Sequence, residues 1–464
     1  MRALPASADV VIAGAGIAGI ATAYYLTAVH GVRDVVLIEP GAPMMLTSAK
    51  PVEGYRNWWG DGAMVQFMNH SLDLLEQLAD ATNNIPRMSR RGYLFASAQP
   101  ESYAFFERVS AEFAALGVGA IRHHTGNRPH PAYTPPPADD RYATPLRGAD
   151  LISDPALIRT QFGYLPDNTR VLLHARRCGW FSASSTGGYL LAQAQAHGAH
   201  LIAGSVSGVQ VAGGRVGGVQ VTTADGSHLI QTRTFVNAAG PFLNHVAGLL
   251  GLAALPMYTE PHYKIAFRDV KRIVPRDAPL VIWFDPIRLV WRDDERAALE
   301  ADPAQHWLLG ELPAEMHWRP AGPDIWQDDT VIVAWTYRTA PEPPSFPFAI
   351  EPRYPELVLR GLASILPAAE AYIGNPVGLE YDGGYYNRTQ ENRPLIGRLP
   401  IEGAYVLGAL SGFGLMGCLG AGELLTAHIT GGALPSYADA FAPQRYADPV
   451  YQQQLQNWQA AWQL

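Results

Sequence analysis

The sequence predicts an α/β fold for this chain of 464 residues, and three observations favour that fold class. An apolar run over residues 10–13 leads into a glycine-rich turn, which is typical of a buried parallel strand that feeds a helix. A second apolar strand is predicted for 34–39 and ends in an acidic residue. Hydrophobic residues make up 48% of the chain and charged residues 16%, as in folded globular proteins. The length suits one large domain or two to three ordinary ones.

The first element, over residues 9–19, has the G-x-G-x-x-G spacing of a Rossmann-type dinucleotide-binding turn. Gly14 permits the turn, Gly16 lets a pyrophosphate approach the backbone, and Gly19 lets the following helix pack against the strand. We expect that helix over residues 17–27. The glycines could instead serve helix packing alone, but strand, turn, helix, strand and acid occur in the order that the motif requires.

This unit also predicts which groups would contact a dinucleotide. The helix begins at Ile17 and Ala18, whose N–H groups and helix dipole would face phosphate. Glu39 lies about 20 residues beyond the last glycine and would accept hydrogen bonds from ribose hydroxyls. Its charge opposes a 2′-phosphate, which disfavours NADP, whereas the motif does not distinguish NAD from FAD.

Composition excludes several other classes of function. The net charge is −8, from 42 acidic and 34 basic residues, which argues against a nucleic-acid partner. The two cysteines, Cys178 and Cys418, are too few for a disulfide framework or a cysteine-rich metal centre, and we predict no metal site. No run of about 20 apolar residues is free of glycine or proline, so we expect no integral membrane segment and a cytoplasmic protein. Lysine is scarce, and its three positions are Lys50, Lys264 and Lys271.

Four further segments carry a family resemblance. They are residues 46–59, with a loop of small and hydroxyl residues before G-x-R; residues 204–209, ahead of a glycine-rich hairpin; residues 234–241, a strand ending in small residues; and residues 384–397 followed by 405–417. The last pair is the most specific. Together these segments resemble the D-amino-acid-oxidase superfamily of flavoenzymes, which includes sarcosine oxidase, glycine oxidase and dimethylglycine dehydrogenase.

The resemblance implies FAD as the cofactor and assigns residues to it. The first segment would follow the pyrophosphate and ribityl chain, the second would meet the adenine, the third the diphosphate, and the last the flavin edge, where helix N–H groups stabilise the reduced ring. The residues implied are Thr47, Ser48, Arg56, Val206, Ala239, Gly240, Gly412, Gly414, Leu415 and Met416. We expect non-covalent FAD, because residues 380–391 contain no cysteine and the loop around Ser48 contains no histidine.

The resemblance also implies two interleaved domains. Residues 1–88, 150–252 and 378–464 would form a discontinuous Rossmann-like FAD-binding domain, and residues 89–149 and 253–377 an antiparallel-sheet α+β substrate domain. Local patterns predict helices over 103–116 and 415–429, a proline-rich loop over 128–147, strands over 281–285, 289–292 and 331–337, and a polar tail from Tyr446 that is compatible with a helix.

Three carboxylate anchors of the family are absent. Met416, Trp59 and Tyr386 stand where relatives have a lysine or an arginine. Arg338, Arg388 or a larger or aromatic amine would compensate. Gly384-Tyr-Tyr together with Met416 is nearer to the branch of the sarcosine oxidase β-subunit and dimethylglycine dehydrogenase.

Five residues are candidates for the reaction. Lys50 would assist oxygen reduction or bind an anionic substrate, or else pair with the pyrophosphate or with Glu53. Lys264, Tyr258 and His262 lie on the segment that faces the flavin in relatives, and His262 would act as a base or serve structure. Tyr386 is the fifth. Four tryptophans, of which core packing is the likelier role for any single one, would wall an aromatic pocket: Trp58, Trp59, Trp291 and Trp335.

These features predict an FAD-dependent oxidase or dehydrogenase that oxidises a C–N bond of an amine or N-methyl amino-acid-like substrate by hydride transfer to flavin N5. Oxygen or another acceptor would reoxidise it. The alternatives are oxidation of a C–O bond in a 2-hydroxyacid, a flavin-bearing electron-transfer subunit of a complex and, least favoured, an NAD-linked dehydrogenase. A homo-oligomer or a complex subunit is compatible with the sequence.

Overall fold

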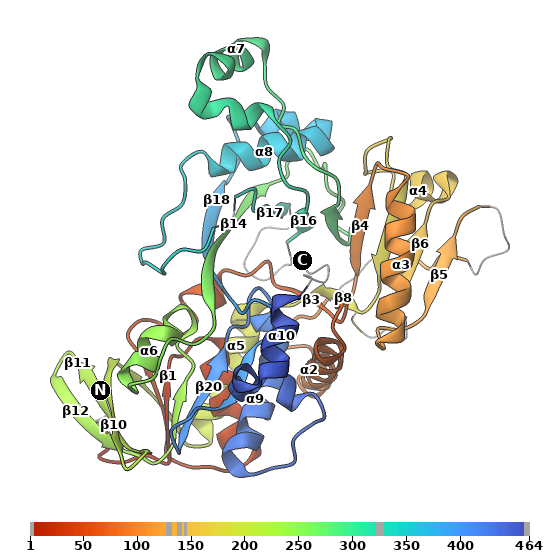
Figure 1. Ribbon diagram of the computed structural model, residues 1–464. Helices are drawn as coiled ribbons and strands as arrows, with labels where there is room; N and C mark the ends of the chain where they lie inside the picture. The colour runs from red at the N-terminus through yellow and green to blue at the C-terminus, as the bar shows by residue number, and fades with distance from the viewer. Residues whose placement is uncertain are drawn as a thin grey trace.

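The computed structural model describes residues 4–126, 132–136, 142, 146–321, 329–338 and 340–458. Most of the predicted proline-rich loop therefore lies outside the described residues. Two large sheets organise the chain, and the long strand β14 (Tyr258–Arg268) runs from the region of the first sheet into the second (Figure 1). No described helix combines the length and apolar character needed to cross a membrane.

The first sheet has six strands in the order β19-β20-β13-β1-β2-β9. All neighbours are parallel except the edge pair β19 and β20. The predicted first strand and the strand predicted for 34–39 are confirmed as its two central members. The strands are β1 Val10–Ala13, β2 Val35–Glu39, β9 Ala199–Ala203, β13 Phe235–Asn237, β19 Leu395–Arg398 and β20 Ala404–Gly408.

Alternating side chains of β1 build two cores. Val10 and Ile12 pack with α1, α2, α5 and α9 on one face. Val11 and Ala13 pack on the other face with α6 and a three-stranded antiparallel sheet made of β10 (Ser205–Ala212), β11 (Arg215–Thr223) and β12 (Gly226–Gln231). A strand buried on both faces explains the continuous apolar run in the sequence.

The helices confirm most predicted boundaries. The helix predicted over 17–27 is α1, which continues into a π-helical turn at Tyr25–Val29, and the helices predicted over 103–116 and 415–429 are α3 and α9. The tail contains α10. The bounds are α1 Ile17–Tyr24, α2 Gly62–Ala81, α3 Ser102–Ala115, α4 Pro155–Gln161, α5 Ala183–Ala196, α6 Leu243–Leu249, α7 Asp293–Ala301, α8 Tyr354–Ile365, α9 Gly414–Thr430 and α10 Pro449–Gln456.

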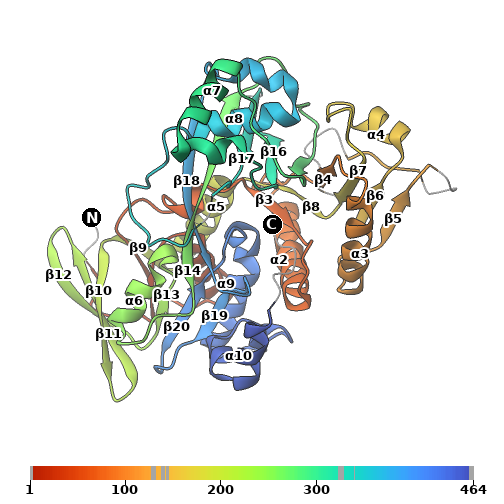
Figure 2. The ribbon, with the colours of Figure 1, turned by 45° about the horizontal axis from the view of Figure 1, so that its top comes forward.

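The second sheet has nine strands in the order β18-β14-β17-β16-β15-β4-β7-β6-β5 and lies beside α3, α7 and α8 (Figures 1 and 2). Most neighbours are antiparallel, but β15 with β4 and β5 with β6 are parallel, so the predicted antiparallel sheet is mixed. The further strands are β4 Tyr93–Ser97, β5 Ile121–His124, β6 Ala149–Ile152, β7 Val171–Ala175, β15 Leu280–Trp283, β16 Met316–Pro320, β17 Thr330–Ala334 and β18 Glu380–Arg388, and a separate pair joins β3 (Gly54–Arg56) to β8 (Cys178–Trp180).

Two sequence predictions differ from these pairings. The strand predicted for 289–292 is wrong, because that segment pairs with no neighbour and the Trp291 indole instead donates to the Leu308 carbonyl at 3.1 Å. Strands β6, β7 and β18 fall in ranges predicted for the first domain, yet they pair within the nine-stranded sheet. The two-domain division stays a prediction, and these pairings favour boundaries that place the three strands with the second sheet.

Candidate functional site

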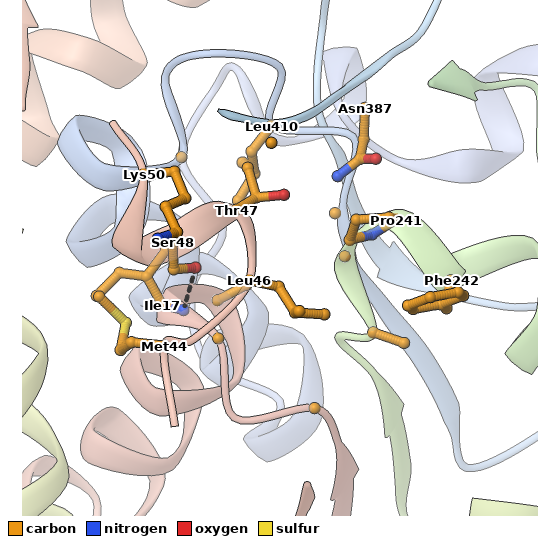
Figure 3. A pocket seen from close by; sticks show the side chains of 18 of the residues that line it. Ile17, Met44, Leu46, Thr47, Ser48, Lys50, Pro241, Phe242, Asn387 and Leu410 are labelled. Atoms are coloured by element: carbon orange, nitrogen blue, oxygen red, sulfur yellow. Dashed lines mark hydrogen bonds between the residues drawn. The ribbon is translucent and has the colours of Figure 1, made fainter. Parts of the chain in front are cut away.

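A cavity of about 340 Å³ lies where the first sheet meets the second, and its size suits a small-molecule site. The carboxyl ends of β1, β2, β13 and β20 supply one part of its lining, as expected for a parallel sheet. The loop at 44–52 and strands β14, β16, β17 and β18 supply the rest. Figure 3 shows side chains from these separate segments around one hollow.

The glycine turn after β1 forms a cradle for a ligand. Gly14 has φ +103°, and a Cβ there would lie 2.5 Å from the Ala238 carbonyl oxygen. A Cβ on Gly16 would lie 3.1 Å from the Ser48 hydroxyl oxygen. Gly14, Gly16, Ile17 and Ala18 all line the cavity, so the predicted phosphate-binding backbone is exposed to it.

Glu39 lies at one end of the cavity, after β2. Its carboxylate accepts from the Ala15 N–H at 2.9 Å and from the Gly41 N–H at 3.2 Å, which fixes the side chain beside the glycine turn. Val206 of β10 lines the same region, next to Gly204 and Ser205. This end therefore combines a fixed carboxylate with exposed backbone, as a ribose and an adenine require.

The loop at 44–52 is attached to the first helix by one hydrogen bond. The Ile17 N–H donates to the Ser48 hydroxyl oxygen at 3.0 Å (Figure 3). Thr47 is held from the other side, because its hydroxyl donates to the Tyr385 carbonyl at 3.3 Å. Both predicted residues of this loop line the cavity.

The turn before α9 forms a second cradle. Ala409 and Ser411 adopt φ values of +51° and +44°, which L residues seldom adopt and which occur most often at functional sites. The Ser411 N–H donates to the Asn387 carbonyl at 2.8 Å, which ties the turn to β18. Gly412, Gly414 and Leu415 line the cavity and bring the start of α9 to it, as do Ala239 and Gly240 after β13.

The other end of the cavity is a face of the nine-stranded sheet. The register pairs Asp382 with Lys264, Lys264 with Ala334, and Ala334 with His317, so these residues form one row across β18, β14, β17 and β16. His262 lies two residues before Lys264 on the same strand face. Lys264, Ala334, His317 and His262 all line the cavity.

Two imidazoles at this end are kept neutral. Burial lowers the pKa of His317 to about 4. Burial also lowers the pKa of His262, although Glu260 opposes the shift. The His262 Nδ1 lies 3.1 Å from the Thr336 hydroxyl, whereas its Nε2 is buried, 3.8 Å from the Glu260 carboxylate and without a hydrogen-bond partner among the described residues. Such a group can accept a proton.

Lys50 does not pair with Glu53. Its Nζ lies 3.3 Å from Asp382 Oδ2, while Arg319 holds Glu53 at 3.0 Å. Lys264 donates to Oδ1 of the same Asp382. The structure therefore brings both sequence-predicted lysines to one carboxylate at the cavity.

Four predicted site residues do not line the cavity. A Cβ on Gly19 would lie 2.0 Å from the Gly14 carbonyl oxygen, so this glycine serves helix packing. Arg56 is buried 4.5 Å from the Trp59 ring centroid, and the Met416 carbonyl accepts from the Ser71 hydroxyl in the α2–α9 contact. Tyr258 lies at the start of β14, half-buried. The four tryptophans proposed as an aromatic wall lie outside the lining as well.

Sequence reasoning missed part of the lining. His317, Thr336 and Asn387 face the cavity from strands or their ends, and Phe242 and His245 face it from the segment after β13. His317 lies between buried Met316 and Trp318, and this alternation was the available signal for an inward-facing strand residue. Tyr386, which was predicted, lines the cavity beside Asn387.

Comparisons with known proteins identify relatives of this fold. A family model described as FAD dependent oxidoreductase (DAO) matches residues 9–428. A sequence search of curated proteins finds no match.

Solved structures are similar over nearly the whole chain. L-proline dehydrogenase from P. horikoshii is 20% identical, with a TM-score of 0.72, over 96% of this chain and 99% of that one. Glycine oxidase from Geobacillus kaustophilus is 15% identical, with a TM-score of 0.67, over 94% and 97%. Iminodiacetate oxidase from Chelativorans sp. is 18% identical, with a TM-score of 0.64, over 94% and 98%.

Proposed function

The chain belongs to the DAO family of FAD-dependent oxidoreductases, and from that premise we propose that it dehydrogenates a C–N bond of an amine or N-methyl amino-acid-like substrate. The protein is an FAD enzyme, and the cavity fits this cofactor. The two cradles at Gly14 and Ser411 admit close backbone contact, and Glu39 is positioned for a ribose. The cofactor residues named above remain proposals in their individual roles.

The observation that carries the proposal is the neutral His262 at the sheet end of the cavity. An amine is protonated in water near neutral pH, and it must lose that proton before its nitrogen lone pair can assist cleavage of the neighbouring C–H bond. The buried Nε2 of His262 has no hydrogen-bond partner among the described residues and can take this proton. When bound, FAD supplies the two-electron acceptor, and the imine product is then hydrolysed by water.

The residues around His262 hold it for this role. Thr336 contacts Nδ1, and the Tyr386 ring lies against one face of the imidazole. Buried neighbours at this end exclude water from the reacting carbon, which protects it during the transfer. The three similar structures cited above are named for amine substrates, which favours C–N over C–O chemistry.

The test is anaerobic reduction of the FAD-loaded protein. N-methyl amino acids, cyclic imino acids, D- and L-amino acids and 2-hydroxyacids are added separately while the visible flavin band is followed. We expect bleaching by at least one class of amine and none by hydroxyacids. Bleaching by hydroxyacids alone would establish the C–O alternative instead.

A second measurement addresses the electron acceptor and the assembly. Oxygen is admitted to the reduced protein, and rapid reoxidation identifies an oxidase, whereas slow reoxidation identifies a dehydrogenase. A flavin-bearing subunit of a complex would turn over poorly alone and copurify with a partner. We further propose the sarcosine oxidase β-subunit and dimethylglycine dehydrogenase branch, and a cytoplasmic location, which cell fractionation tests.

A further inference from the structure

Two of the three lysines in the chain meet at one aspartate beside the cavity. Lys264 and Asp382 face each other across the antiparallel pair of β14 and β18, and the ammonium donates to Oδ1. Lys50 reaches Oδ2 of the same side chain at 3.3 Å from the loop at 44–52. Lys264 is 8% exposed, whereas Lys50 and Asp382 are 35% and 33% exposed, so the cluster runs from a buried position toward the opening.

The cluster carries an excess of positive charge. Two ammonium groups share one carboxylate, which leaves one positive charge without a counter-ion inside the cluster. Glu53 is the next acid in the loop, but Arg319 holds its Oε2 at 3.0 Å and the Ala183 N–H donates to its Oε1 at 2.9 Å. Its charge is therefore already balanced by Arg319.

Arginines do not supply this charge elsewhere in the cavity. Among the described residues that line it, the side chains with a permanent positive charge are Lys50 and Lys264. The two arginines considered as substitutes for the family anchors have other contacts. Arg388 pairs with Glu260 at 3.0 Å, and the Arg338 guanidinium lies 4.3 Å from the Trp307 ring centroid.

We propose that Lys50 and Lys264 form the subsite for a carboxylate of the substrate, with Asp382 as the resident counter-ion that this carboxylate partly displaces. The inference rests on the proposed function and narrows its substrate to amines that carry an anionic group. Charge-assisted hydrogen bonds from two ammonium groups would orient the substrate from the lysine end, while its nitrogen meets His262. Asp382 holds the lysines together when no substrate is bound.

The experiment measures binding without turnover. The FAD-loaded protein is titrated by calorimetry with 2-furoate, a carboxylate that carries no amine, and with its uncharged amide. Lys50→Met and Lys264→Met are each expected to raise the Kd of 2-furoate about tenfold, the usual effect of losing a hydrogen bond to a charged group. The Kd of the amide should not change.

Two further variants sharpen the test. Asp382→Asn is expected to lower the Kd of 2-furoate, because it removes the competing carboxylate while preserving the shape of the side chain. Lys271→Met is the matched control: this third lysine is exposed on a turn outside the cavity and its loss should leave both ligands unaffected. A purely structural cluster would give the opposite sign for Asp382→Asn, namely weaker binding.

Equal Kd values of 2-furoate for the wild type and both lysine variants would overturn the proposal. Should Lys264→Met fail to retain FAD, the partly exposed Lys50→Met decides the outcome. The result separates from that of the proposed function, because amine-dependent flavin reduction with lysine-independent 2-furoate binding refutes only the subsite. Lysine-dependent binding without reduction by any amine refutes only the proposed reaction.

Discussion

The imidazole of His262 stacks on the phenol ring of Tyr386, with ring centroids 3.6 Å apart and an interplanar angle of 14°. The residues lie on the neighbouring strands β14 and β18. Tyr386 also packs against the turn before α9, since a Cβ on Gly412 would lie 2.5 Å from its ring. The stack therefore connects the proposed base to the cradle in which the flavin edge is expected.

The first prediction concerns this base. His262→Asn should slow anaerobic flavin reduction by the best amine about 100-fold near pH 7, the typical contribution of a general base. Because burial lowers the pKa of His262 below its ordinary value, the wild-type rate should rise with pH through a midpoint below about 6.5, and the variant should lack this rise. Stopped-flow measurement across pH tests both. Tyr386→Phe keeps the ring and should retain the pH midpoint, and an unchanged profile in His262→Asn would exclude the role.

A second prediction concerns the first cradle. Gly14→Ala places a Cβ 2.5 Å from the Ala238 carbonyl oxygen, at a φ of +103°. Gly213→Ala is the matched control, since Gly213 has φ +59° on the β10–β11 hairpin with no atom within 4 Å of the added Cβ. We expect Gly14→Ala to lower the free energy of unfolding about 2 kcal/mol more than the control and to weaken FAD retention. Urea unfolding and flavin content measure the difference, and equal losses would contradict the steric argument.

The third prediction concerns flavin attachment. Both cysteines are buried, neither lines the cavity, and burial raises the pKa of each thiol to about 12, so neither is available as a thiolate. Acid denaturation of the purified holoprotein should therefore release all flavin into the supernatant. Flavin that remains with the precipitated chain would refute non-covalent binding.

A fourth prediction concerns a buried ion pair behind the site. Glu391 and Arg445 are 0% and 4% exposed and 2.8 Å apart, and the hydroxyls of Tyr446 and Tyr451 donate to the same carboxylate oxygen. Glu391→Gln should lower the free energy of unfolding by about 3 kcal/mol, because it leaves a buried guanidinium without its counter-ion. Asp294→Asn, which removes an exposed partner of Arg292, should change it by less than about 0.5 kcal/mol. Similar urea midpoints for the two variants would contradict this account.

The fifth prediction concerns acid stability. His174 is fully buried between Arg176, Tyr133 and the Arg91 carbonyl, and burial lowers its pKa to about 3. Between pH 6.5 and about 3 the unfolded chain holds a proton on this residue that the folded chain lacks, so stability falls as the pH falls. His174→Gln should remove about 1.4 kcal/mol per pH unit from that dependence. Urea unfolding between pH 6.5 and 4.5 gives the slopes, and parallel slopes would show that His174 does not titrate in this way.

Local sequence patterns predicted the elements near the glycine turns well. The spacing of Gly14 and Gly16 and the acid at Glu39 require only short-range geometry, which the sequence states directly. The segments after β13 and before α9 were likewise found through their small residues.

The contacts at the sheet end could not be predicted in this way. Which residue faces Lys264 depends on the register between strands more than a hundred positions apart, and the pairing with Asp382 follows from that register. Lys50 was therefore assigned Glu53 as an alternative partner, since the contact between Arg319 and Glu53 spans 266 positions. Leu289–Arg292 has a strand-like pattern, but its tryptophan packs against the segment that contains Leu308 instead.

The strand order of the six-stranded sheet has a consequence for synthesis of the protein. Its centre is made from the first forty residues, but β20 and the turn before α9, which complete the second cradle, begin only at Ala404. A nascent chain can build the first cradle early and still lacks the opposite wall of the cavity until nearly all of it has left the ribosome. Tight capture of the flavin is thus a late, post-translational event, and C-terminal truncation before Ala404 should yield colourless protein however well its first half folds.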